Sequence, residues 1–338
     1  MNFDVLPTEA VNPWTRDLDI MTTQEILLAM NAEDRTAIAV VASRIPEIAA
    51  VAERAAETIR RGGRLIYAGA GTSGRLAMLD AAECVPTFGL EPGIVVALLA
   101  GGPLAMTAAI EGAEDDVNGA AAELARLQVS AADMLVGIAA SGATPYVLGA
   151  ICRAKAAGAF TVGLTSAPGS PLAAAADLAV VLDVGPEVLA GSTRLKAGTA
   201  QKMVLNMIST AAMVRLGKVY RNLMVDVRPT NAKLRARALR IVRDAGGVGP
   251  EEAAALLEAA GGNAKTAIVM ARTGAGFDKA MRLLAETGGS VRAAVERAKS
   301  ICNKEAVQKD ENSARLFRRN VERNCGQGCR SGGSQAGD

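Results

Sequence analysis

The stretch RLIYAGAGTSGR, residues 64–75, sets the fold, because an apolar run enters a glycine-rich turn that opens a helix. Four further apolar runs lie at 93–100, 133–139, 159–165 and 177–184. None of the runs alternates with polar residues, which is typical of strands buried on both faces. Helical stretches separate the runs, among them 75–84, ended by Pro86, and 105–127. This order predicts an α/β fold with a five-stranded, parallel, doubly wound sheet.

By pattern, the 338 residues divide into four segments. We expect residues 1–50 to form an N-terminal arm and helices, and residues 51–230 to form the sheet domain. Residues 231–302 contain short helical stretches separated by glycines, which predicts a small all-α module. Residues 303–338 are polar and rich in glycine, so we expect a disordered tail.

Composition excludes several kinds of chemistry. The sequence has no histidine, so it can hold no Ser-His-Asp triad, no Cys-His pair and no His-ligated metal. Carboxylates, Lys or Tyr must therefore move any protons. Lys and Arg number 37 against 35 for Asp and Glu, a net charge of +2. This balance gives no reason to expect nucleic acid or an anionic membrane as a partner.

We expect a cytoplasmic protein. The first residues carry acids and prolines where a signal peptide needs an apolar region, and no apolar run approaches a membrane span. Five cysteines are an odd number, and Cys84, Cys152 and Cys302 are scattered, which fits a reducing compartment better than a disulfide framework. Cys325 and Cys329, in the tail, have no other metal ligands nearby and do not indicate a metal site.

The first turn contains G-x-G-x-x-G, which taken alone would suggest dinucleotide binding. That function needs an acid at the end of the second strand, about 20 residues on. Residues 98–102 read LLAGG and supply none, which argues against NAD. The same turn suits an anion, because glycines allow close approach, helix N-terminal N–H groups point at the ligand, and Thr72 and Ser73 add hydroxyls. An ordinary tight turn with a capping serine is the simpler alternative.

A second loop, SGATP at 141–145, follows the third strand, and a doubly wound sheet places it beside the first loop at the switch point. Together the two loops predict an oxyanion cradle that needs no metal. A third segment, 190–199, follows the fifth strand, although a helix cap with solvated bases would explain it equally well. The candidate phosphate- and substrate-binding residues are Gly71, Thr72, Ser73, Gly74, Ser141, Gly142, Thr144, Ser192 and Lys196.

These loops resemble the sugar isomerase (SIS) domain, a phosphosugar-binding fold. The longer blocks are similar to the N-acetylmuramic acid 6-phosphate etherase family. They are GRLIYAGAGTSGRLAMLDAAEC (63–84), AIEGAEDD (109–116), GIAASGATPYV (137–147), GSTRLKAGTAQKMVLNMIST (191–210) and NLMVDVRPTN (222–231). The resemblance spans about Thr8 to Lys299. It departs at Ala143, where the family commonly has Arg, and in the tail.

The resemblance implies a reaction and a setting. The expected enzyme is a carbon–oxygen lyase that converts N-acetylmuramate 6-phosphate and water to N-acetylglucosamine 6-phosphate and D-lactate during cell-wall recycling. It implies a small-molecule phosphosugar as substrate, no metal and no organic cofactor. It also implies a homodimer and a UBA-like C-terminal helical module.

The resemblance also assigns Glu83 and Glu114 as the catalytic pair. Glu83 would protonate the departing lactate, and Glu114 would remove the proton at C2. They lie 31 residues apart, so only the fold, within one chain or across a subunit boundary, can bring them together. Apolar neighbours in the sequence suggest a raised pKa for Glu83, which suits an acid. Glu114 stands among other acids, a pattern that is also typical of a solvated helix face.

Two other functions fit the same fold. One is a non-catalytic phosphosugar sensor, as in glucokinase regulatory protein, and the other is an aldose–ketose isomerase. Release of D-lactate distinguishes an etherase from both. A sugar-responsive transcription regulator would need a basic DNA-binding helix, and residues 9–61 contain none.

Overall fold

The computed structural model describes residues 7–227 and 232–304, together with 308, 311 and 315. The chain forms two compact units, one ending at Leu234 and the other beginning at Arg235.

The first unit is built on a five-stranded sheet, as predicted. Its strands are β1 (Leu65–Gly69), β2 (Val95–Leu99), β3 (Met134–Ile138), β4 (Phe160–Thr165) and β5 (Leu178–Val181). All are parallel, in the order β2-β1-β3-β4-β5. Gly69 at the end of β1 pairs with Leu99 on one side and Ile138 on the other. The carboxyl ends of the three strands are therefore level, and the direction of winding reverses between β1 and β3.

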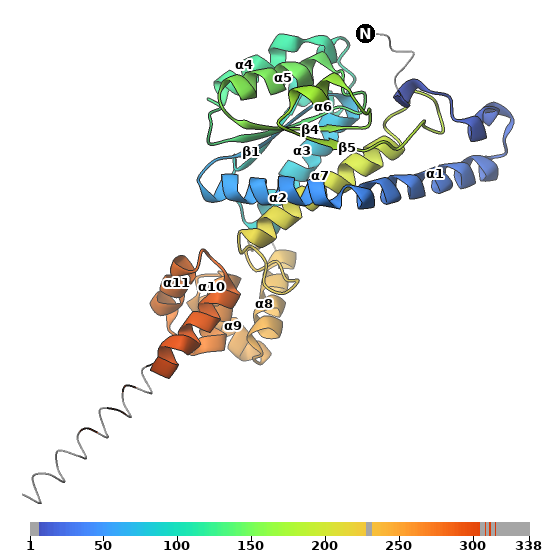
Figure 1. Ribbon diagram of the computed structural model, residues 1–338. Helices are drawn as coiled ribbons and strands as arrows, with labels where there is room; N and C mark the ends of the chain where they lie inside the picture. The colour runs from blue at the N-terminus through green and yellow to red at the C-terminus, as the bar shows by residue number, and fades with distance from the viewer. Residues whose placement is uncertain (1–6, 228–231, 305–307, 309–310, 312–314, 316–338) are drawn as a thin grey trace, which may run out of the picture. The chain divides into compact units, whose positions relative to one another are not determined.

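Helices cover both faces of the sheet (Figure 1). One face packs on α1 (Thr23–Ser43), α2 (Ile45–Arg60), α3 (Gly71–Phe88) and α7 (Lys196–Arg215). The other packs on α4 (Val117–Arg126), α5 (Pro145–Ala156) and α6 (Pro171–Ala175). Alternate side chains of β1 explain both cores: Leu65 and Tyr67 enter the first, and Ile66 and Ala68 enter the second. Burial on both faces accounts for the continuous apolar runs.

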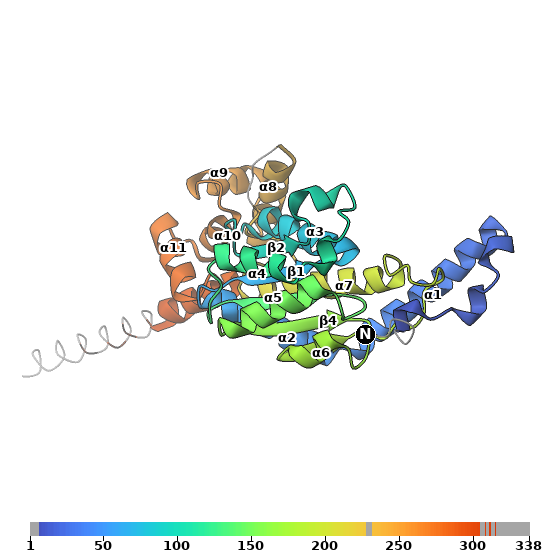
Figure 2. The same cartoon turned by 90° about the horizontal axis from the view of Figure 1, so that it is seen from above.

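The N-terminal segment consists of short 3₁₀ turns and one long helix. The turns are η2 (Pro7–Glu9), η3 (Pro13–Thr15) and η4 (Leu18–Ile20). Thr22 and Glu25 form a capping box that starts α1. The first half of α1 extends past the sheet (Figure 2), and it leaves Leu27 and Leu28 59% and 61% exposed.

Two predicted helices were wrong in their bounds. The helix expected over 75–84 begins at Gly71 and runs through Pro86 to Phe88. Its last turn buries Phe88 in the core, which offsets the hydrogen bond that proline cannot donate.

The stretch 105–127 is not one helix. It contains η5 (Gly102–Met106), η6 (Ala113–Asp115) and only then α4. Gly112 has φ +70°, which breaks the helix, and the Asp116 side chain accepts from the N–H groups of Asn118 and Gly119 to start α4.

The second unit is helical throughout its described residues. It contains α8 (Ala232–Gly246, whose first residues precede the boundary), α9 (Pro250–Ala259), α10 (Ala264–Thr273), α11 (Phe277–Glu286) and a helix at 291–304. Of the segment 303–338, only residues 303, 304, 308, 311 and 315 are described, and they are helical. The rest of the expected tail, with Cys325 and Cys329, lies outside the described residues. Across the described ranges, no helix combines the length and apolarity needed to cross a bilayer.

Candidate active site

A cavity of about 510 Å³ lies at the carboxyl ends of β1 and β3. The two loops from the switch point form its walls, so the fold brings together the segments that the sequence singled out. The residues that line it are Thr8, Glu9, Ala70, Gly71, Thr72, Ser73, Glu114, Asp115, Ile138, Ala139, Ala140, Ser141, Ala143, Thr144, Pro145, Gly191 and Thr193.

The first wall is the start of α3. Gly71 has φ +53°, a conformation that favours glycine. A Cβ on Gly74 would lie 2.5 Å from the carbonyl oxygen of Gly69, so glycine at 74 lets α3 pack directly on β1. The N–H groups of the first turn have no partner within the helix, so they are available to an anion. Ser73 lies among them, and its Oγ donates to Gln201 Oε1 at 2.8 Å.

The second wall is the loop from β3 to α5. Gly142 has φ +64°, and a Cβ there would lie 2.2 Å from Ser170 Oγ, so glycine is required. The Ser141 Oγ accepts from the Ala143 N–H at 3.3 Å. Thr144 is the N-cap of α5 but does not cap it with its side chain. The starts of α3 and α5 thus both meet the cavity, with Thr72, Ser73, Ser141 and Thr144 around them, which suits a phosphate.

Four predicted binding residues do not line the cavity: Gly74, Gly142, Ser192 and Lys196. Gly74 and Gly142 instead allow the close packing described above. Ser192 lies between Gly191 and Thr193, which do line the cavity. Lys196 is buried, and its Nζ pairs with the Glu33 carboxylate of α1. Lys196 therefore joins α1 to the start of α7 in this chain.

A buried glutamate fixes the start of α7. The Glu187 carboxylate accepts from the N–H groups of Lys196 at 3.2 Å and Ala197 at 2.9 Å. Burial raises the pKa of Glu187 above its ordinary value, although both hydrogen bonds oppose the shift. This contact sets where the preceding loop, with Gly191 and Thr193, meets the cavity.

The two candidate catalytic glutamates lie apart in one chain. Glu114, in η6, lines the cavity. Glu83 is exposed on α3, 12 residues beyond Gly71, which corresponds to about 18 Å along the helix axis. Its apolar sequence neighbours Ala81 and Cys84 lie on the side of the helix that packs into the core and are buried. The expected apolar surroundings of Glu83 are therefore absent from this chain's described residues.

Behind the first wall, a buried carboxyl ties α3 to β1 and α7. Asp80 is 4% exposed and accepts from Tyr67 Oη at 3.0 Å, Asn206 Nδ2 at 2.6 Å and Ser209 Oγ at 3.0 Å. Burial raises the pKa of Asp80 above its ordinary value, and the three hydrogen bonds only partly oppose that shift. Burial, with the nearby Asp80, also raises the pKa of the Cys84 thiol to about 12.

Sequence reasoning missed two residues of the cavity, Thr8 and Glu9. They come from η2, far upstream of the switch-point loops. The only local signal is a proline followed by a short polar turn, which does not indicate a binding site. Within the described residues, no group of three His, Cys, Asp or Glu side chains could hold a metal ion.

Comparison with known proteins defines the class and then the family. Residues 47–155 match the glucokinase regulatory protein N-terminal SIS domain, and residues 116–211 match the SIS domain. Solved phosphoheptose isomerases from Francisella tularensis and Neisseria gonorrhoeae are 19% and 20% identical, with TM-scores of 0.45 and 0.44. They cover 57% and 56% of this chain, and 98% of each structure is matched. The two family matches alone, at residues 47–155 and 116–211, place an SIS domain in the first unit, as the loops predicted.

Two curated relatives carry the same name, N-acetylmuramic acid 6-phosphate etherase. The one from Streptomyces avermitilis is 55% identical over 79% of this chain and 86% of its own. The one from Mycolicibacterium smegmatis is 55% identical over 81% of this chain and 92% of its own. The chain belongs to the N-acetylmuramic acid 6-phosphate etherase family, which confirms the resemblance.

Proposed function

We propose that this chain cleaves the D-lactyl ether of N-acetylmuramate 6-phosphate, giving N-acetylglucosamine 6-phosphate and D-lactate. The observation that carries the proposal is the cavity, in which Glu114 lies together with the starts of α3 and α5. The similarity to named etherases over four-fifths of the chain supports it. This reaction serves the recycling of cell-wall sugars.

The phosphate binds in the two switch-point loops. The N–H groups that start α3 and α5, with the hydroxyls of Thr72, Ser141 and Thr144, offer neutral donors to a dianion. The Ser73 hydroxyl joins them when it exchanges its hydrogen bond to Gln201 Oε1 for one to the phosphate. Among the described lining residues, none is Lys or Arg. Backbone dipoles and hydroxyls thus carry the recognition, and Ala143 leaves the second loop without a side-chain cation.

The ether is cleaved by elimination and then hydration of the open-chain aldehyde. Glu114 takes the C2 proton, which the C1 carbonyl acidifies, and the C3–oxygen bond breaks as Glu83 gives a proton to the departing lactate oxygen. Water then adds its oxygen to C3 of the unsaturated aldehyde, and C2 regains a proton. One water is consumed, and both carboxyl groups return to their starting states.

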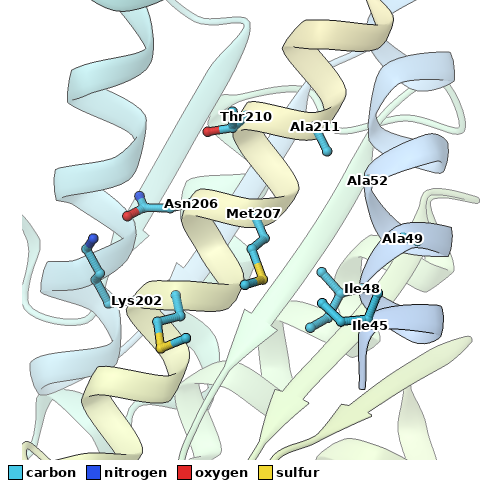
Figure 3. Close-up of a pocket in the computed structure, with 10 residues that line it drawn as sticks. Ile45, Ile48, Ala49, Ala52, Lys202, Asn206, Met207, Thr210 and Ala211 are labelled. Carbon is cyan, nitrogen blue, oxygen red and sulfur yellow. The ribbon is translucent and has the colours of Figure 1, made fainter. Parts of the chain in front are cut away.

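We infer that a second chain completes this division of roles, because Glu83 lies about 18 Å along α3 from the start of the cavity wall. A groove of about 590 Å³ between α2 and α7 offers an apolar surface for it (Figure 3). Ile48 and Met207 face each other across this groove, and the projecting part of α1 exposes Leu27 and Leu28. In the homodimer that we propose, each chain supplies its Glu83 to the cavity of the other.

Cytoplasmic placement is also part of the proposal. Cys84, Cys152 and Cys302 are free thiols, which suits a reducing compartment.

The function is tested by incubating the full chain with N-acetylmuramate 6-phosphate and assaying D-lactate. Release of D-lactate with N-acetylglucosamine 6-phosphate supports the etherase. Conversion of a phosphosugar to its ketose without lactate identifies an isomerase, and saturable binding without turnover identifies a sensor.

The two glutamate roles separate in deuterated water. Glu83→Ala should still exchange the C2 hydrogen while releasing no lactate, and Glu114→Ala should lose both. Loss of a general acid or base costs about 10²–10⁴-fold in rate. Exchange that survives only in Glu114→Ala would reverse the two roles.

Mixing the two variants tests whether the site is shared. In random dimers formed after dissociation, one intact site arises in each mixed pair, so activity should recover to about a quarter of wild type. No recovery, with mixed dimers verified by tagged chains, would place both glutamates of a working site in the same chain.

A further inference from the structure

The N-terminal arm supplies part of the cavity wall. We propose that Thr8 and Glu9 bind the neutral hydroxyl and amide groups of the sugar whose phosphate lies in the switch-point loops. The inference deepens the proposed function, since it rests on a phosphosugar occupying this cavity. It assigns these two residues to recognition of the sugar rather than of the phosphate.

The arm is held in place by the loop between β5 and α7. The Gly191 N–H donates to the Thr8 carbonyl at 3.1 Å. Thr15 Oγ1 donates to the Val188 carbonyl at 2.8 Å, and Asn12 Nδ2 donates to the Pro186 carbonyl at 3.4 Å. Three contacts over eight residues fix the arm against this loop, so Thr8 and Glu9 meet the cavity in a preformed position.

Thr8 presents a buried hydroxyl that has no partner in the described part of the chain. Its side chain is 4% exposed, and its Oγ1 makes no hydrogen bond to any residue that the structure describes. Buried polar groups are ordinarily satisfied, and Thr8 lines the cavity. A bound sugar hydroxyl or amide group would supply the missing partner.

Glu9 presents a carboxylate in the same wall. A Cβ on Gly191 would come 2.9 Å from Glu9 Oε2, so the carboxylate lies against the backbone of the anchoring loop, where glycine leaves room. Among the described contacts, no hydrogen bond or ion pair occupies this carboxylate.

The charge of the cavity determines what Glu9 can bind. Glu9, Glu114 and Asp115 all line it, so the phosphate and the lactyl carboxylate are repelled from this part of the wall. The remaining polar groups of the substrate are hydroxyls and an amide N–H, which donate to carboxylates. Glu9 therefore accepts from the neutral part of the sugar and helps to orient it.

The test measures two affinities of the full chain by calorimetry, one for N-acetylglucosamine 6-phosphate and one for inorganic phosphate. Glu9→Ala should weaken sugar phosphate binding about 10- to 100-fold, the range for a lost hydrogen bond to a charged group, and leave phosphate binding unchanged. Asp19→Asn changes an exposed carboxylate of the same arm outside the cavity and should change neither affinity.

Thr8→Val separates recognition from folding. It replaces an unpartnered hydroxyl by a methyl group of the same shape, so the thermal midpoint of the free protein should hold or rise while sugar phosphate binding weakens severalfold. Unchanged sugar phosphate affinity in both Glu9→Ala and Thr8→Val would overturn the inference, as would an equal loss of both affinities. D-lactate release by the wild-type chain is measured separately. Its absence would refute the proposed etherase activity, whereas the two affinities test the roles of Thr8 and Glu9 in sugar binding.

Discussion

Replacing Asp80 by Ala should destabilise the first unit more than any exposed change of the same size. Asp80 accepts three hydrogen bonds from Tyr67, Asn206 and Ser209, and the Tyr67 ring is fully buried. The change removes the acceptor and leaves three donors without it. Each unsatisfied donor costs about 1–3 kcal/mol, and since water can reach the partly exposed Asn206, we expect a total of roughly 3–5 kcal/mol.

The free energy of unfolding is measured by urea titration followed by circular dichroism near neutral pH. Asp183→Ala, an exposed carboxylate beside β5, is the matched control and should change stability by less than about 0.5 kcal/mol. In Figure 3, Asn206 points from α7 toward α3, so loss of Asp80 loosens that pair of helices. A loss below about 1 kcal/mol for Asp80→Ala would refute the role of this carboxyl as a link between them.

The pH dependence follows from the same residue. Burial raises the pKa of Asp80, so the folded chain keeps this proton to a higher pH than the unfolded chain does. Between the ordinary pKa of 3.8 and the raised pKa of the folded chain, the contribution of Asp80 to the free energy of unfolding falls as the pH rises. Above the raised pKa this contribution is lost. Relative to Asp80→Asn, which cannot ionise, wild type should therefore lose stability as the pH rises from about 4 through the raised pKa of Asp80. A relative gain over that range would contradict the assignment.

Three further changes have defined outcomes. Ser73→Ala or Ser141→Ala should weaken substrate binding by about 1–3 kcal/mol, seen as a higher KM, and Thr107→Ala, an exposed hydroxyl outside the cavity, should not. Unphosphorylated N-acetylmuramate should be a very poor substrate, and turnover comparable to that of the phosphorylated sugar would rule out the phosphate cradle. Lys196→Met should lower the free energy of unfolding by about 3 kcal/mol, because it leaves the partly buried Glu33 carboxylate without its cation. Adding Glu33→Gln should restore part of that loss. An unchanged free energy of unfolding with a raised KM would instead identify Lys196 as a substrate ligand.

The sheet and its switch point could be predicted because parallel strands buried on both faces leave continuous apolar runs, and glycines mark the turns after β1 and β3. The loops at 71–74 and 141–145 follow from that topology. The bounds of α3 could not be predicted, because burial of Phe88 overrides the local effect of Pro86. The turns before α4 depend on the conformation of Gly112, which a search for apolar periodicity ignores.

Long-range contacts explain the remaining differences between the site predicted from the sequence and the site in the structure. Lys196 looks like a loop cation in the sequence, but its partner Glu33 lies 163 residues away. Glu83 has apolar sequence neighbours, yet the phase of α3 turns it outward while Cys84 turns inward. Glu9 reaches the cavity only because the N-terminal arm binds the loop before α7. No local sequence pattern indicates this contact.

The central claim, elimination followed by hydration, is tested most directly by turnover in ¹⁸O-labelled water. The incoming oxygen should appear at C3 of N-acetylglucosamine 6-phosphate, and the hydroxyl of the released D-lactate should carry none, because the bond that breaks is the one between C3 and the ether oxygen. Label in the lactate hydroxyl would mean that water attacks the lactyl carbon, and the mechanism proposed for Glu83 and Glu114 would have to be abandoned.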